Sequence, residues 1–115
     1  MIVAVPLFGS RISPHFGSSS TVAWYEVRNR GIVTRHIRHM QENPPGDPMC
    51  LARQIVASGA DVLVCGGIQN QCREWMQHRG IRVLENHKGK AEEIVSELVA
   101  TEPCFTVHKS RDRRE

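Results

Sequence analysis

The feature that most constrains this fold is the alternation of short apolar runs with helical segments between residues 48 and 100. Residues 62–65 and 81–84 are too short for helices and are typical of buried strands. Strands joined through helices run parallel with right-handed crossovers, so this half of the chain predicts an α/β fold. The expected helices, whose apolar residues recur at helical spacing, cover residues 48–58, 70–78 and 90–100.

The first forty residues predict three more strands. Residues 2–6 form an apolar, β-branched run suited to a central strand covered on both faces. Residues 21–27 and 32–40 flank an Asn-Arg-Gly turn and indicate a hairpin. Arg35 and His36 on its second strand suit the edge of a sheet, because charges discourage pairing with another chain.

The predicted order of elements is βββαβαβα, with an antiparallel meander followed by two parallel strands. The simplest packing is a five-stranded mixed sheet of strand order 3-2-1-4-5 with helices on its faces, a three-layer ribonuclease H-like α/β domain. We expect one domain over residues 1–102 and a flexible, basic tail over residues 103–115. The hydrophobic fraction of 40% and charged fraction of 23% agree with a globular chain.

Composition argues against several classes of protein. The net charge is +3, but four of the fifteen Lys and Arg residues lie in residues 108–115, so the remainder gives no support for nucleic-acid binding. No apolar run reaches the ~18 residues of a membrane helix, and residues 1–7 lack the basic flank of a signal peptide. We therefore expect a cytoplasmic protein, whose four cysteines are thiols or metal ligands rather than disulfides.

A binding crevice is expected where the first, third and fourth strands end, because their carboxyl ends meet at one sheet edge. The first and fourth strands are neighbours whose connections leave in different directions, which defines a topological switch point. Two helix N-termini point at this crevice and offer N–H groups to an anion. The residues delivered there are Arg11, Ser13, His15, Cys50, Cys65, Gly66, Gly67, Asn70 and Cys72.

The candidate metal ligands are His15, Cys50, Cys65 and Cys72, because thiolate and imidazole suit iron–sulfur and related chemistry. Each has a structural alternative. His15 could anchor its loop to a backbone carbonyl, and Cys65 and Cys72 could be small apolar residues of the core. Cys104 lies past the last helix, remote from the crevice, and the cysteine spacing matches no structural zinc site.

Taken together, these segments resemble the dinitrogenase iron–molybdenum cofactor biosynthesis family. The resemblance implies a ribonuclease H-like domain that binds or carries a metal–sulfur cluster or a cluster precursor, either an iron–sulfur or a molybdenum-containing sulfide. It implies His15 as the first ligand and a Gly66-Gly67-Ile68 turn that lets a bulky anionic cluster approach the backbone. The segments that carry it are residues 2–6, Arg11-Ile12-Ser13-Pro14-His15-Phe16-Gly17, residues 25–27, 59–64, 66–68 and 80–83.

We therefore expect a carrier and not an enzyme, with donor and acceptor proteins of cluster assembly as partners and neither nucleic acid nor membrane. A homodimer that shares one cluster stays open, as does a cluster-free regulatory or partner-binding domain on the same scaffold. A nuclease needs converging carboxylates with one on the first strand, which has none. Thiol catalysis through Cys50 or Cys65 with His15 lacks a local signature.

Overall fold

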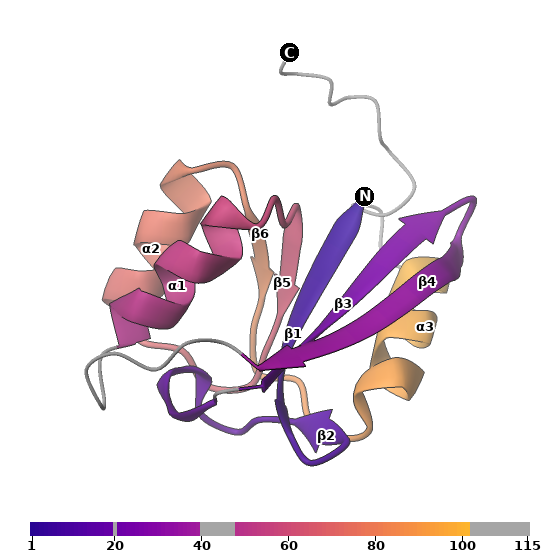
Figure 1. The fold of residues 1–115 in the computed structure, drawn as a ribbon, viewed down its shortest axis with the longest axis horizontal. Coiled ribbons are helices and arrows are strands. Elements are labelled where there is room, and N and C mark those ends of the chain that lie inside the picture. The colour runs from indigo at the N-terminus through magenta and orange to yellow at the C-terminus, as the bar shows by residue number, and fades with distance from the viewer. Residues whose placement is uncertain (20, 40–47, 102–115) are drawn as a thin grey trace.

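The computed structural model describes residues 1–19, 21–39 and 48–101. The expected tail, Cys104 and the end of the expected third strand at Met40 lie outside the described residues. The strands are β1 (Ile2–Phe8), β2 (Arg11–Ile12), β3 (Thr21–Arg28), β4 (Gly31–His39), β5 (Val62–Val64) and β6 (Arg82–Leu84). The helices are α1 (Pro48–Ala57), α2 (Asn70–His78) and α3 (Ala91–Thr101), with a short 3-10 turn, η1 (Phe16–Ser18) (Figure 1).

The strands form one mixed sheet along the path β4-β3-β1-β5-β6, and β2 pairs with β1 beside that path. β1 runs antiparallel to β3 and parallel to β5, and β6 is parallel to β5. The mixed α/β class and its three helices are confirmed. The expected count of five strands is wrong, because β1 extends beyond Pro6 and its residues Leu7 and Phe8 pair with Ile12 and Arg11.

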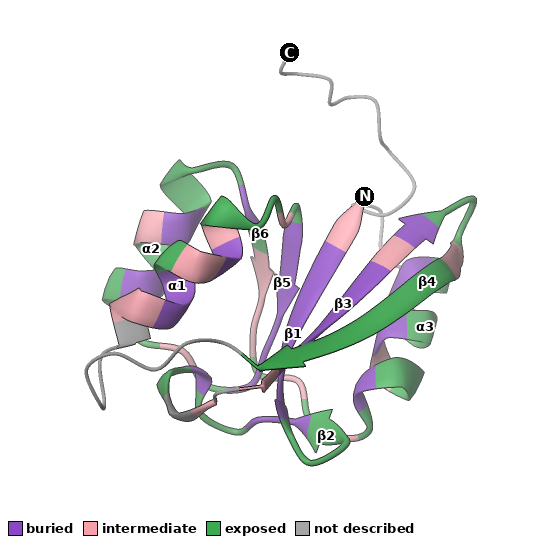
Figure 2. Cartoon of the chain, viewed as in Figure 1, coloured by how far each residue is buried: buried purple, intermediate pink, exposed green. Residues whose placement is uncertain are grey.

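The helices cover both faces of the sheet, with α1 and α2 on one face and α3 on the other (Figure 1). Successive strand residues point to opposite faces, so each central strand contributes to two cores. Val3 packs in the core with Val95 of α3, whereas its neighbour Ala4 packs in the core with Ile55 of α1. Figure 2 shows the consequence, buried central strands and an exposed β4. Within the described residues, no helix has the length and apolar character needed to cross a membrane.

The expected hairpin of β3 and β4 is formed through a turn at Asn29 and Arg30. Both residues have positive φ, 53° and 64°, which a two-residue turn of this hairpin type requires at both central positions. Asn adopts this left-handed conformation readily, whereas Arg does so at a cost. The ladder continues to the pair Thr21 and His39, with one irregularity between Glu26 and Val27.

Candidate functional site

The loop that follows β2 passes around the edge of the sheet from one core to the other. Ile12 is buried in the core beneath α3, and Phe16 is buried in the core beneath α1 and α2. The Ile12 N–H donates to the carbonyl oxygen of Gly89 (2.9 Å), and the Ser13 N–H donates to that of Pro6 (2.9 Å). Both ends of the loop are therefore held in apolar surroundings, while residues 13–15 cross the end of β5.

Backbone pairing fixes this crossing against Gly67. The Gly67 N–H donates to the carbonyl oxygen of Pro14 (2.8 Å), and the Phe16 N–H donates to that of Gly67 (2.9 Å). His15 and Gly67 thereby form a parallel bridge. A Cβ on the preceding Gly66 would lie 2.6 Å from the Ser13 carbonyl oxygen. The space in front of Gly66 is therefore filled by the loop itself, and this glycine does not supply the room that the family resemblance implied for a cluster.

The side chain of His15 is exposed, while its main chain is engaged. The Ser13 hydroxyl, itself buried, donates to the His15 carbonyl oxygen (3.0 Å) and stiffens the turn. Among the described residues, no hydrogen bond involves the imidazole, and it does not cap η1. The main chain and Ser13 therefore anchor the loop, which is the structural role that the sequence left open for the His15 side chain. Ser13 positions the loop instead of facing a ligand.

A second loop, residues 85–90, lies beside the same strand end and was missed in the sequence analysis. The Asn86 N–H donates to the Gly66 carbonyl oxygen (2.9 Å), and the His87 N–H donates to that of Cys65 (3.0 Å). Arg73 of α2 pairs with Glu85 at 3.3 Å, which ties the helix to this loop. The sequence allowed this loop to be predicted, because the last expected strand runs parallel to the one before it and must end at the same edge of the sheet. The half-buried His87 is the second histidine whose main chain adjoins the end of β5.

The start of α2 presents main-chain donors toward this region. Its N-cap residue, Gln69, makes no side-chain capping hydrogen bond, and Asn70 is exposed. First-turn N–H groups of a helix have no intrahelical acceptor, so they favour an anion. Asn70 therefore lies where the sequence predicts it, at the opening of an uncapped helix.

The three candidate cysteines lie in two kinds of surroundings, two of them in the core and one half-buried. Cys65 and Cys72 are fully buried in the core beneath α1 and α2, where the Cys72 Sγ lies 3.5 Å from the Met49 Sδ. Burial, with a smaller contribution from the charge of Glu85, raises the pKa of the Cys65 thiol to about 12. Cys50, in the first turn of α1, is half-buried, and the Gln54 amide nitrogen lies 3.4 Å from its Sγ.

The expected four-ligand set is not assembled in the structure. Within the described part of the chain, no three His, Cys, Asp or Glu side chains group closely enough to hold a metal ion. The reason is the direction in which the backbone points each side chain, because strand residues alternate between the two faces of the sheet and a helix turns one side toward the core. Cys65, directly after β5, points into the core and Cys72 lies on the inward face of α2, whereas His15 is on an exposed loop.

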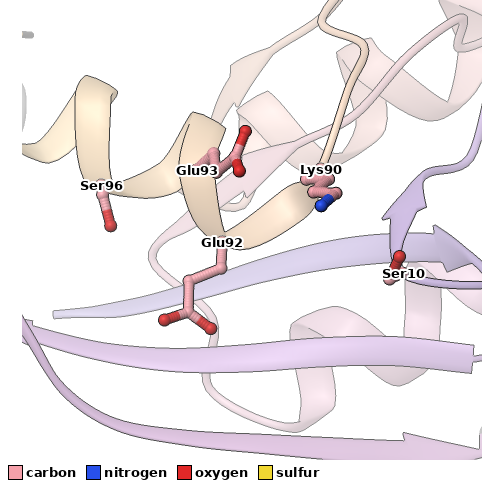
Figure 3. Close-up of a pocket in the computed structure, with 5 residues that line it drawn as sticks. All are labelled: Ser10, Lys90, Glu92, Glu93 and Ser96. Atoms are coloured by element: carbon pink, nitrogen blue, oxygen red, sulfur yellow. The ribbon is translucent and has the colours of Figure 1, made fainter.

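Arg11 lies toward α3, away from the two helix starts. It is exposed in β2 and forms a bridge with Lys90, which precedes α3. Beside it is an open hollow lined by Ser10, Lys90, Glu92, Glu93 and Ser96 (Figure 3). Two carboxylates against one ammonium make this hollow unfavourable for an anion, and Glu92 also pairs with Arg35 at 2.9 Å. The hollow therefore differs in its chemistry from the surroundings of His15.

The fold and this site define a small three-layer α/β domain that presents a histidine-bearing loop at the carboxyl ends of its parallel strands. The chain belongs to the dinitrogenase iron–molybdenum cofactor family, whose model matches residues 1–101. Membership gives the protein a role related to that cofactor, as the sequence segments predicted. No curated protein matches the chain.

Solved structures share the fold. PH0822 superposes with a TM-score of 0.77 at 22% identity, over 86% of this chain and 88% of that one. A candidate dinitrogenase from Methanocaldococcus jannaschii gives 0.68 at 13% identity, over 86% and 88%. A candidate NifB protein from Thermotoga gives 0.64 at 15% identity, over 88% of each chain. At these identities the structures establish the fold alone.

Proposed function

We propose that this protein binds a metal–sulfur cluster, or a precursor of the iron–molybdenum cofactor, in the crevice at the ends of β1 and β5. One observation carries the proposal. The His15 imidazole is exposed and has no hydrogen bond within the described residues, although three hydrogen bonds hold the loop beneath it. They run from the Gly67 N–H to the Pro14 carbonyl oxygen, from the Phe16 N–H to that of Gly67 and from the Ser13 hydroxyl to that of His15. A rigid loop that presents an uncommitted imidazole is suited to ligation, because the ring needs no rearrangement to meet a metal.

The surroundings favour a soft, anionic ligand. The uncapped start of α2 places a partial positive charge near the crevice. His87 and the half-buried Cys50 lie on flanking elements, but with His15 they do not group closely enough to hold one metal ion, so we propose His15 alone as the fixed ligand. Cys65 would have to be uncovered and deprotonated before it could ligate, so we assign it to the core.

We further propose that the domain carries its ligand between proteins and performs no chemistry on it. A cluster held by Cys or His residues usually has four protein ligands, more than one copy presents here. The remaining positions would be taken by sulfide, by a donor or acceptor protein, or by a second copy of this chain. Incomplete ligation suits transfer, because an open position lets the next ligand bind before the first releases. The strand path also leads us to assign the ribonuclease H-like arrangement to the sheet.

Titration with tetrathiomolybdate, a soluble anionic molybdenum sulfide, tests the binding proposal by amide NMR. We expect shift changes confined to residues 13–16, 66–72 and 86–87. His15→Ala should weaken binding by about tenfold or more, a usual effect of losing a metal-site contact. His36→Ala is the matched control, since His36 is also exposed but lies on β4. Absence of any response, or shifts scattered over basic residues in both variants, would overturn the proposal and favour the cluster-free regulatory domain.

A further inference from the structure

Strand β4 forms one edge of the sheet along its whole length. Among the described strands it pairs only with β3, so its other side presents main-chain N–H and C=O groups. Residues 33–39 are all exposed, which Figure 2 shows as an unbroken exposed strand. We call residues 31–39 the β4 edge. An exposed edge of this length is a template for pairing with another extended segment.

The β4 edge combines apolar and cationic side chains. Ile37 is 69% exposed and Val33 is 51% exposed, two of the three large apolar side chains that are exposed among the described residues. The strand also carries Arg35, His36, Arg38 and His39 and no acidic residue. Apolar contact with cationic flanks favours a partner segment that alternates apolar and acidic residues.

Two arginines stand on opposite faces of this edge. Arg38 is opposite Val22, which points toward α1 and α2, whereas Arg35 is opposite Tyr25, which points toward α3. The Arg38 guanidinium lies 5.0 Å from the centre of the Trp24 ring, and Arg35 pairs with the exposed Glu92. Neighbouring groups therefore hold both guanidinium groups close to β4, one on each face of the sheet.

The same charges disfavour two other occupants. Antiparallel pairing of two β4 edges would bring the cations of one copy against those of the other, and like charges across a strand pair are destabilising. Single-stranded nucleic acid binds on aromatic stacking platforms, and the β4 edge contains no Phe, Tyr or Trp. We propose that the β4 edge docks an extended acidic segment of a partner protein, which adds to the sheet as a further strand. This inference is independent of whether the His15 crevice holds a cluster.

A ten-residue peptide that alternates glutamate with valine tests this docking, with amide NMR and hydrogen exchange on the full chain. We expect shift changes and slowed exchange confined to the β4 edge. A peptide with lysine in place of glutamate should bind at least about tenfold more weakly, because the charges then repel. Arg38→Glu should weaken binding of the glutamate peptide by about fivefold or more, whereas Arg82→Glu on the opposite edge strand, β6, should not change it.

Four outcomes would overturn the proposal. Equal binding of a glutamate peptide N-methylated at alternate residues would show that no main-chain ladder forms. Shifts that map to β6 or to the helices would place the contact elsewhere. Tighter binding of a ten-base oligonucleotide than of the peptide, with the same Arg38 dependence, would identify a nucleic-acid surface. Dimerisation of the chain through β4 in sedimentation would identify a second copy as the occupant.

Discussion

The carbonyl oxygen of Ser13 lies 2.6 Å from the position that a Cβ on Gly66 would occupy. Pro14 is almost as close, with its Cα and its carbonyl oxygen each 3.0 Å from that position. All three are main-chain atoms, so they cannot rotate away as the end of a flexible side chain could. The glycine is therefore what allows the His15 loop to lie against the end of β5.

Gly66→Ala should lower the free energy of unfolding by about 1–3 kcal/mol, the usual cost of forcing an extra group into a packed site. The added methyl group must displace residues 13 and 14, so we also expect amide shift changes for Ser13 and Phe16. Chemical denaturation followed by amide NMR of the variant measures both effects.

Gly31→Ala is the control for this substitution. A Cβ there would meet only the Arg28 carbonyl oxygen at 3.8 Å, an ordinary contact, and we expect a change within about 0.5 kcal/mol. If the two alanine variants were equally stable, the close approach of the His15 loop to Gly66 would be refuted.

The stability of the fold should decline at alkaline pH because of Cys65. Its pKa is raised in the folded state, so the buried neutral thiol contributes stability that is fully present below its ordinary value of 9.0. That contribution is lost as the pH rises from 9.0 toward about 12, because the unfolded chain releases the proton first. The slope approaches about 1.4 kcal/mol per pH unit. Urea unfolding at several pH values measures it.

Cys65→Ala separates this effect from other groups. The variant loses packing at every pH, but between pH 9 and 10 its stability should fall less steeply than that of the natural chain. Burial also raises the pKa of Tyr25 above 10.0, so steeper loss at higher pH includes that residue in both proteins. Parallel curves for the two proteins below pH 10 would contradict the assignment to Cys65.

Arg30→Gly should stabilise the hairpin. Arg30 adopts a φ of 64°, which is strained for a residue with a Cβ and unstrained for glycine. Asn-Gly is also the preferred pair for a two-residue turn of this type. We expect the free energy of unfolding to rise by about 0.5–1 kcal/mol, measured by thermal or chemical unfolding. This is a net value, because the relief of strain is partly cancelled by the greater entropy of glycine in the unfolded chain. Arg82→Gly, within β6 and without positive φ, should be destabilising instead, and a loss at both positions would contradict the turn assignment.

Most of the fold was predictable because its elements carry their own periodic signals. α2 occupies residues 70–78 as expected, and the apolar runs at residues 2–6 and 62–65 gave the central parallel pair. β2 was missed because a strand of two residues has no period to detect. Its pairing depends on the turn after Phe8, where Gly9 has a φ of 66°.

The site was less predictable, because its arrangement depends on which parts of the chain pack against one another in three dimensions. Gly66 was assigned to ligand approach, yet the atoms in front of it belong to Ser13 and Pro14. Cys65 was placed at the correct strand end, but the sequence does not state which face of the sheet the last residue of a short strand points to. His87 was missed because only the loops of three strands were followed to the edge, although β6 ends there too.

The most direct test of the central claim is metal content after anaerobic reconstitution with iron and sulfide, with and without molybdate. We expect stoichiometric metal and visible charge-transfer bands in the natural chain and in His36→Ala, and a sharp loss of both in a folded His15→Ala variant. Equal metal content in all three proteins, or a colourless and metal-free natural chain under every condition, would contradict it.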